Sequence, residues 1–163
     1  MADFYNAFEV FEMAEQIERN GGEFYRKAAE MSEDEELSGV LQQLATMEDD
    51  HIRVFSSLKE KLAGQEWAQG FDQENEAVLF LRAMASGKVF DSKKDPAQML
   101  AGMSMAAVLD KAIGVEKDSI AFYTGIKELV PQEFGRERID NIIKEEMRHV
   151  RILSERLAAM SEF

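Results

Sequence analysis

The segments Glu48-Asp-Asp-His51 and Glu146-Met-Arg-His149 decide the fold, because they contain both histidines of the chain and place each one three residues after a glutamate. On an α-helix a step of three residues rises about 4.5 Å and turns about 300°, so the two side chains of each pair project from one face. A carboxylate and an imidazole in this arrangement can bind the same metal ion. Each segment is therefore predicted to form half of a metal site.

The two segments belong to a longer repeat with an offset of 98 residues, which also maps Glu18 onto Glu116. A single Glu-x-x-His is usually accidental in a chain rich in glutamate, whereas a repeated pattern is not. The sequence therefore predicts an internal duplication of a helix pair. The same offset aligns further identical residues, namely Ala14 with Ala112, Phe24-Tyr25 with Phe122-Tyr123, Arg53 with Arg151 and Ser56 with Ser154.

Composition predicts one domain spanning residues 1–163. The chain is 45% apolar and 31% charged, which is enough to build one sizeable core. Its 163 residues are too few for a second core. It contains no cysteine, which excludes disulfides, thiolate zinc sites, iron–sulfur clusters and cysteine nucleophiles. Any metal must therefore be held by oxygen and nitrogen ligands.

Charge and hydropathy exclude two classes of partner. The net charge of −13 opposes binding to nucleic acid or to anionic membranes, both of which need a basic surface. The N-terminal sequence lacks the pattern of a signal peptide, and no segment approaches 18 uninterrupted apolar residues. We therefore expect a soluble, cytoplasmic protein that binds no nucleic acid and no membrane.

Apolar periodicity predicts two long helices in the first half. The first runs from Tyr5 to about Met31 and carries Glu18. Ser32-Glu-Asp-Glu35 is typical of a capping box, and the second helix should follow it and end near Gly64. The apolar stripe of this second helix includes Glu48 and His51, which are therefore expected in the interior.

Residues 65–103 interrupt the repeat and predict a crossover. It contains a short helix at about Glu74 to Ala85 and a turn-rich stretch from Gly87 to Pro96. Asp95-Pro96 is typical of a helix start, and the apolar run from Met99 should continue as the third long helix to Leu129. A fourth helix is expected from about Glu133 to Met160.

These elements predict an all-α fold, a ferritin-like antiparallel four-helix bundle with a long B-to-C crossover between its second and third long helices. The first and third helices would each supply one glutamate, and the second and fourth would each supply Glu-x-x-His. This set is the known ligand pattern of ferritin-like dinuclear carboxylate sites. The predicted metal ligands are Glu18, Glu48, His51, Glu116, Glu146 and His149.

Charge supports two divalent ions in this site. Four buried carboxylates without cations would cost several kcal/mol per ion or would take up protons. Two histidines and four carboxylates suit iron or manganese, and zinc is a plausible substitute on purification. The residues alone do not select among these metals.

Other residues near the ligands allow two interpretations each. Tyr25 and Tyr123 follow Glu18 and Glu116 by seven residues, so each phenol either hydrogen-bonds a ligating carboxylate or belongs to the core. Glu15 is one turn from Glu18, but its repeat mate is Ile113, which favours a solvated glutamate over a further ligand. Gly21-Gly22 either opens a small channel to the metals or serves packing.

The quoted motifs resemble the rubrerythrin branch of the ferritin-like superfamily over essentially the whole chain. The resemblance implies a di-iron centre with Glu48 and Glu146 as bridging ligands, Glu18 and Glu116 as terminal ligands, and one histidine on each metal. It also implies reduction of hydrogen peroxide or dioxygen, commonly in defence against oxidative stress, and pairing as a homodimer.

Two departures from the family bear on activity. Full-length rubrerythrins carry a cysteine-ligated rubredoxin module, and this chain has no cysteine, so the electron donor would be a separate protein. Typical rubrerythrins have a further glutamate where this chain has Ser119. The expected function is a di-iron oxidoreductase, with a ferroxidase or iron-handling protein and a non-enzymatic metal-stabilised bundle as alternatives.

Overall fold

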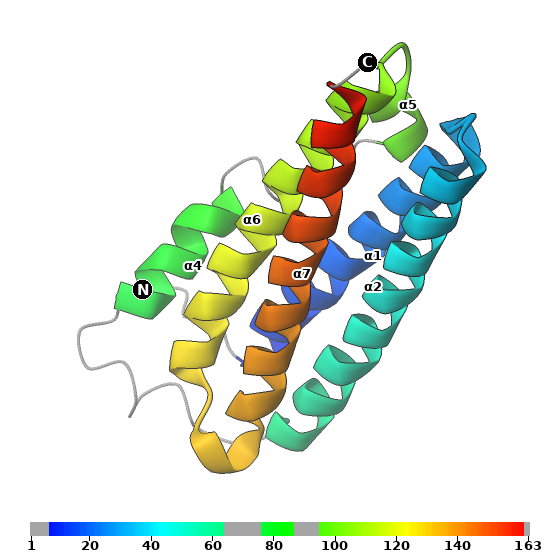
Figure 1. Cartoon of the computed structure of the whole chain (residues 1–163). Coiled ribbons are helices and arrows are strands. Elements are labelled where there is room, and N and C mark those ends of the chain that lie inside the picture. Colours follow the sequence, from blue (N-terminus) through cyan, green and yellow to red (C-terminus); the bar gives the residue numbers. More distant parts are fainter. Residues whose placement is uncertain (1–6, 64–75, 87–94, 162–163) are drawn as a thin grey trace.

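Four long helices form the molecule in a computed structural model that describes residues 7–63, 76–86 and 95–161. They are α1 (Ala7–Met31), α2 (Glu35–Leu62), α6 (Met105–Leu129) and α7 (Arg136–Met160). Helix α1 packs along α2, and α6 packs along α7, so each half of the repeat forms one antiparallel hairpin (Figure 1). The all-α bundle and its duplicated helix pair are confirmed.

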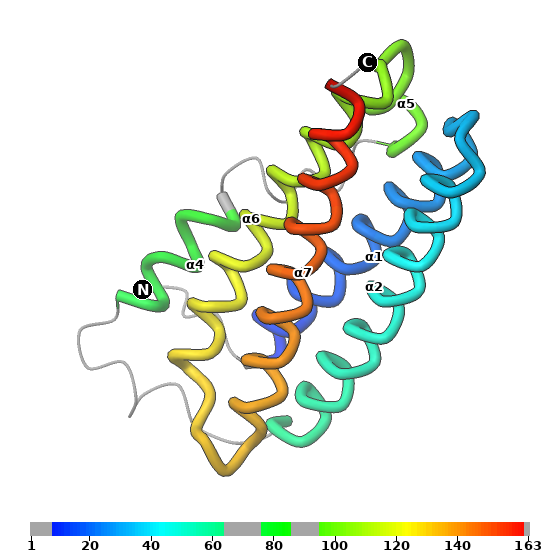
Figure 2. Tube along the Cα trace, viewed as in Figure 1, coloured from blue at the N-terminus to red at the C-terminus, as the bar shows by residue number. Residues whose placement is uncertain are grey.

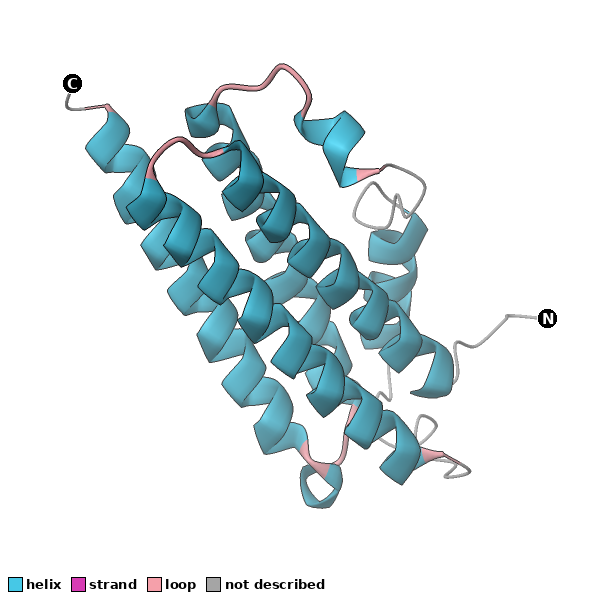
Figure 3. Ribbon diagram, turned by 90° about the vertical axis from the view of Figure 1, so that its right-hand side faces the viewer, coloured by secondary structure: helices cyan, strands magenta, loops and turns pink. Residues whose placement is uncertain are grey.

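The connection between the two hairpins runs the length of the bundle, because α2 ends at the opposite end from where α6 begins (Figure 2). It contains α4 (Glu76–Ser86), which packs against α6, and α5 (Pro96–Leu100), which packs against α1. Only helices, short loops and turns occur among the described residues (Figure 3). The predicted crossover with a short helix is therefore present, while its turn-rich part at residues 87–94 lies outside the described residues.

The apolar core is divided into two clusters along the bundle. One contains Phe11, Phe55 and Phe122, and the other contains Leu41 and Leu109, all of which are fully buried. The six predicted ligands belong to neither cluster although all are buried. The fold therefore surrounds a polar layer with apolar packing at both ends.

Three helix boundaries differ from the sequence prediction. The N-cap of α2 is Asp34, whose side chain accepts hydrogen bonds from the backbone N–H groups of Glu36 and Leu37, so the predicted Ser32 capping box is wrong. Ser32 instead donates its hydroxyl to the carbonyl of Asp34. An aspartate next to the first turn satisfies the free N–H groups and also complements the positive end of the helix.

The predicted third helix is divided in two. Asp95 caps α5 and Pro96 begins it as expected, but α5 ends at Leu100 and Gly102 adopts a φ of 74° that a helix cannot contain. Ser104 then caps α6. Before α7, a 3-10 turn at Gln132–Phe134 and Gly135, with a φ of 109°, occupy the predicted start near Glu133.

None of the described helices combines the length and the apolar character needed to cross a bilayer.

Candidate metal centre

The six predicted ligands meet in the polar layer between the two apolar clusters. Their exposed fractions are at most 4%, so each carboxylate and imidazole is removed from solvent. Helix α1 supplies Glu18, α6 supplies Glu116, and α2 and α7 each supply one Glu-x-x-His pair. The structure thus brings together all six residues that the repeat marks as ligands.

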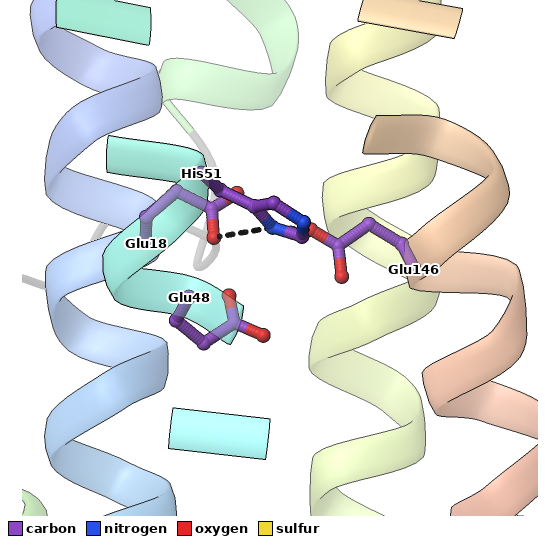
Figure 4. A group of neighbouring side chains, drawn as sticks. All are labelled: Glu18, Glu48, His51 and Glu146. Carbon is purple, nitrogen blue, oxygen red and sulfur yellow. Dashed lines mark hydrogen bonds and ion pairs between the residues drawn. The ribbon is translucent and has the colours of Figure 1, made fainter. Parts of the chain in front are cut away.

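The ligands divide into two groups of four that share two members. One group contains Glu18 and His51, the other contains Glu116 and His149, and both contain Glu48 and Glu146. Within each group, one donor atom per residue lies within 4.8 Å of the others. Figure 4 shows the first group, in which the side chains from three helices point toward one another. Two adjacent metal positions joined by Glu48 and Glu146 fit this arrangement.

The Nδ1 atoms of both histidines point toward the carboxylates. Nδ1 of His51 lies 3.2 Å from Glu18 and 3.0 Å from Glu146, and Nδ1 of His149 lies 2.8 Å from Glu146 and 3.2 Å from Glu48. Oε1 of Glu48 and both oxygens of Glu146 have these histidine contacts, but none of the three has a partner with hydrogen-bond geometry among the described residues. Buried polar atoms without hydrogen bonds are costly, and metal ions would satisfy them.

Two tyrosines link each half of the repeat to the other. Tyr25 of α1 donates its hydroxyl to Glu116 of α6, and Tyr123 of α6 donates to Glu18 of α1. Burial and the neighbouring carboxylates raise the pKa of both phenols well above the usual range, so both remain donors. These bonds fix the orientation of Glu18 and Glu116, the two carboxylates that belong to only one ligand group each.

The cluster without metal ions holds protons strongly. Burial and the charges of Glu18 and Glu116 raise the pKa of Glu146 to about 8. Burial and the charge of Glu18 also raise the pKa of Glu48. Burial alone would lower the pKa of His51, but its contacts with Glu146 and Glu18 outweigh this effect and raise the pKa to about 12.

His149 follows the same pattern. Burial acts to lower its pKa, but Glu116 and Glu146 raise the pKa to about 10. Glu18 differs, because hydrogen bonds with Glu48, His51 and Tyr123 outweigh the effect of burial and lower its pKa. Metal ligation needs neutral imidazoles and ionised carboxylates, so binding at this cluster would release protons.

Glu145 is a functional candidate that the repeat does not mark. Its Oε2 lies 2.7 Å from Nε2 of His51, and its side chain is 39% exposed. The repeat mate of Glu145 is Met47, and Nε2 of His149 is buried with no hydrogen-bond partner among the described residues. Sequence comparison of the two halves could not reveal Glu145, because it has no counterpart in the first half.

Glu15 is not solvated as predicted, because it is only 4% exposed. Lys59 and Arg19 explain its burial, since their side-chain nitrogens lie 2.9 Å and 3.1 Å from its carboxylate oxygens. Glu15 belongs to neither of the two ligand groups. Its carboxylate therefore forms buried ion pairs outside the two ligand groups.

The two glycines of Gly21-Gly22 differ in their surroundings. A Cβ at Gly21 would lie 3.2 Å from Oε2 of Glu48, while a Cβ at Gly22 would meet Arg26 and Asp49. Gly21 lines a cavity of about 830 Å³ that also reaches Glu48 and Glu116. A second cavity of about 370 Å³ reaches His51 and Glu145 from between α2 and α7.

Comparisons with known proteins support the fold. No family model and no curated protein matches the chain. Among solved structures, the chain is similar to a protein of Thermotoga maritima described as a ferritin-like diiron-carboxylate protein, with a TM-score of 0.68 and 23% sequence identity. The similarity covers 95% of this chain and 96% of that one. An all-α bundle that superimposes over almost its whole length has the ferritin-like fold, as the sequence predicts.

Proposed function

We propose that this chain is a di-iron oxidoreductase of rubrerythrin type, which reduces hydrogen peroxide or dioxygen with electrons from a separate donor protein. The observation that carries the proposal is the pair of four-residue groups that share Glu48 and Glu146. Shared carboxylates between two histidine-containing groups are what a bridged pair of metal ions needs. The structural similarity to a protein described as a diiron-carboxylate protein supports the same choice.

The donor set fits two divalent ions. Glu18 and His51 would hold one ion, Glu116 and His149 would hold the other, and the two shared carboxylates would bind both. Four ionised carboxylates balance the charge of two divalent cations, which removes the cost of burying unpaired charges. Oxygen and imidazole ligands suit iron or manganese, and iron accounts for the redox function.

When bound, reduced iron would supply electrons and Lewis acidity to the oxidant. The contribution of the protein is to fix the ligands and to limit access by water. Tyr25 and Tyr123 orient the two terminal carboxylates, and Glu145 orients the His51 ring through Nε2. The apolar clusters cover the polar layer at both ends, so the site is reached only from its sides, through the two cavities among the described residues.

The departures from typical rubrerythrins shape the proposal. These 163 residues contain no cysteine and so no rubredoxin-type iron site, and in this proposal the electrons would come from a separate donor protein. Ser119, at the position of the additional family glutamate, is 3% exposed and donates its hydroxyl to the carbonyl of Val115 in its own helix. A serine in this position supplies no carboxylate to the metals, so the ligand set stays at six residues.

Anaerobic loading with ferrous iron followed by rapid mixing with hydrogen peroxide or dioxygen tests the proposal. We expect the diferrous protein to be oxidised within seconds by at least one oxidant and to be restored by an external reductant. His149→Ala, which removes a ligand of only one group, is the matched variant and should react much more slowly. A wild-type diferrous protein that remains unchanged with both oxidants would contradict the proposal.

Iron handling is a second candidate, favoured by the net charge of −13, which attracts cations to the surface. A ferroxidase that passes iron onward should accept more than two ferrous ions per chain over repeated turnover. A redox enzyme should instead remain at two. Measuring iron uptake per chain during repeated additions of ferrous iron and oxidant distinguishes the two functions.

A further inference from the structure

The cavity between α1 and α6 is larger than the proposed oxidants require. Its volume is about 830 Å³, whereas hydrogen peroxide needs about the space of two water molecules, roughly 60 Å³. Pockets of about 300 to 1,000 Å³ are typical of sites for small organic molecules. Access for peroxide or dioxygen therefore does not explain the size of this cavity.

The inner end of the cavity lies at the candidate metal centre. Glu48, Glu116 and Tyr25 all line it, and each is at most 4% exposed. Oε2 of Glu48 lies next to Gly21, which also lines the cavity, since a Cβ added at Gly21 would be 3.2 Å from this oxygen. A molecule in the cavity would therefore lie against the carboxylates that hold the metals.

The walls of the cavity are largely apolar, and its outer part is acidic. Ile17, Phe24 and Val115 contribute to the walls, and Met99 of α5 contributes at one end. The charged lining residues outside the metal centre are Asp110, Lys111 and Asp118, which together carry one net negative charge. This surrounding favours an uncharged molecule with mainly apolar surface and disfavours an anion.

Small residues keep the cavity open next to the metals. Gly21 and Ser119 occupy corresponding positions of the repeat, and both line the cavity. Gly114 lines it as well, and a Cβ added there would have no atom within 4 Å. A glycine inside α6 costs roughly 1 kcal/mol relative to alanine without relieving any close contact, so packing does not explain it.

We propose that the cavity between α1 and α6 is a binding site for an uncharged, mainly apolar organic molecule that reaches the metal centre. The site deepens the proposed function, because it places an organic ligand against the ligating carboxylates. Binding in the cavity needs only the shape and polarity of its walls. It can therefore be measured on the protein with or without metal.

A series of straight-chain alcohols, 1-butanol, 1-hexanol and 1-octanol, is a suitable set of probes, with octanoate as the charged counterpart. Titration calorimetry should show one molecule of 1-octanol bound per chain, with affinity rising about threefold to fourfold for each methylene group. Octanoate should bind at least tenfold more weakly than 1-octanol. Absence of saturable binding by the whole series would overturn the proposal.

An added Cβ at Gly114 has no atom within 4 Å, so Gly114→Leu should place its side chain in the cavity and weaken 1-octanol binding at least tenfold. Gly39→Leu is the matched control, because Gly39 lies in α2, does not line the cavity, and has no atom within 4 Å of an added Cβ. This control should bind 1-octanol as the wild type does. Val115→Trp provides a second cavity-filling variant, and unchanged binding in both filled variants would place the ligand elsewhere and refute the site.

Cobalt in place of iron separates this proposal from the proposed function. In the cobalt-loaded protein, 1-octanol should change the visible absorption spectrum, since it would lie against the metal ligands. If cobalt does not bind, the metal assignment fails while the calorimetric result still decides the cavity. If cobalt binds and alcohols do not, the cavity proposal fails alone.

Sedimentation tests a different occupant of the cavity. A dimer that binds no alcohol would refute the proposal and would assign the α1/α6 face to a second copy of the chain.

Discussion

The two hairpins, α1–α2 and α6–α7, carry the same candidate ligands in different surroundings. Each supplies one glutamate, one Glu-x-x-His pair and one tyrosine that bonds a carboxylate of the other hairpin. Only His51 has a carboxylate partner at Nε2, namely Glu145, whereas Nε2 of His149 has no partner among the described residues. The duplication therefore preserves the candidate ligands, while the residues around them have diverged.

A second difference separates the faces of the bundle. The α1/α6 face contains the cavity of about 830 Å³, and the α2/α7 face contains the smaller cavity of about 370 Å³ beside His51 and Glu145. The two ligand groups have the same residue types, but the cavities that reach them differ in size. The two proposed metal positions should therefore differ in affinity and in the molecules that can reach them.

Removing a shared carboxylate should affect both halves of the site. Glu48→Ala and Glu146→Ala should each reduce the metal content from about two ions per chain to nearly none, because each carboxylate belongs to both groups. Glu18→Ala and His149→Ala, which alter one group each, should retain about half of the metal. Elemental analysis of the purified variants measures this difference, and full metal content in Glu48→Ala would disprove the shared role.

Glu145 should distinguish the two halves. Glu145→Ala should weaken one of the two metal-binding steps by about 10-fold to 100-fold, because His51 loses the carboxylate that orients its ring. Met47→Ala, at the corresponding position of the first half, should change neither step appreciably. Competition with a chelator of known affinity measures both steps, and equal effects of the two substitutions would remove the proposed asymmetry.

The stabilisation by metal should grow as pH rises from 5 to 8. Folding raises the pKa of Glu146 from 4.5 to about 8 and that of His149 from 6.5 to about 10, so the metal-free folded protein binds more protons than the unfolded chain. The stability that these groups contribute is complete below their unfolded pKa values and is lost as pH rises toward the folded values.

Metal ions displace these protons, so their binding strengthens over the same range of pH. Melting temperatures with manganese and with a chelator, compared at pH 5, 6, 7 and 8, should therefore diverge steadily. A constant difference between the two sets of melting temperatures would show that the cluster does not exchange protons for metal.

Glu15→Ala should have the smallest effect on the site. It breaks the ion pair with Lys59, which should cost about 1 kcal/mol of stability because Lys59 remains partly exposed. The metal content should stay unchanged, as it would for a residue outside both ligand groups. A loss of metal in this variant would indicate that Glu15 is a seventh ligand. The two halves would then differ in their ligands as well, because the corresponding residue of the second half is Ile113.

The sequence was sufficient to predict the bundle and the six candidate ligands that meet in it, because a duplication records both. Equal spacing of Glu18 to Glu48 and of Glu116 to Glu146 predicts that the ligands lie at one level, and the structure places them there. Helix boundaries were predicted less well than the helices themselves. Ser32 and Asp34 are both suitable N-cap residues, so the sequence does not decide which of them caps α2. The apolar run from Met99 continues through Gly102 and so hides the break between α5 and α6.

Tertiary contacts explain what the repeat could not predict. Glu145 reaches His51 from a different helix, and no spacing along the chain reveals a contact between residues so distant in sequence. The sequence favours a solvated Glu15, because spacing along the chain does not reveal that Lys59 of α2 lies beside its carboxylate. The sequence did not predict the cavity between α1 and α6, because small lining residues such as Gly21 and Ser119 permit a cavity without requiring one.

Metal content per chain tests the central claim most directly. The protein should be produced in iron-supplemented medium, purified without chelator and analysed by plasma mass spectrometry against its amino-acid content. We predict close to two metal ions, iron or manganese, for each folded chain. A folded protein without bound metal, which also binds none when ferrous iron is added anaerobically, would contradict the account.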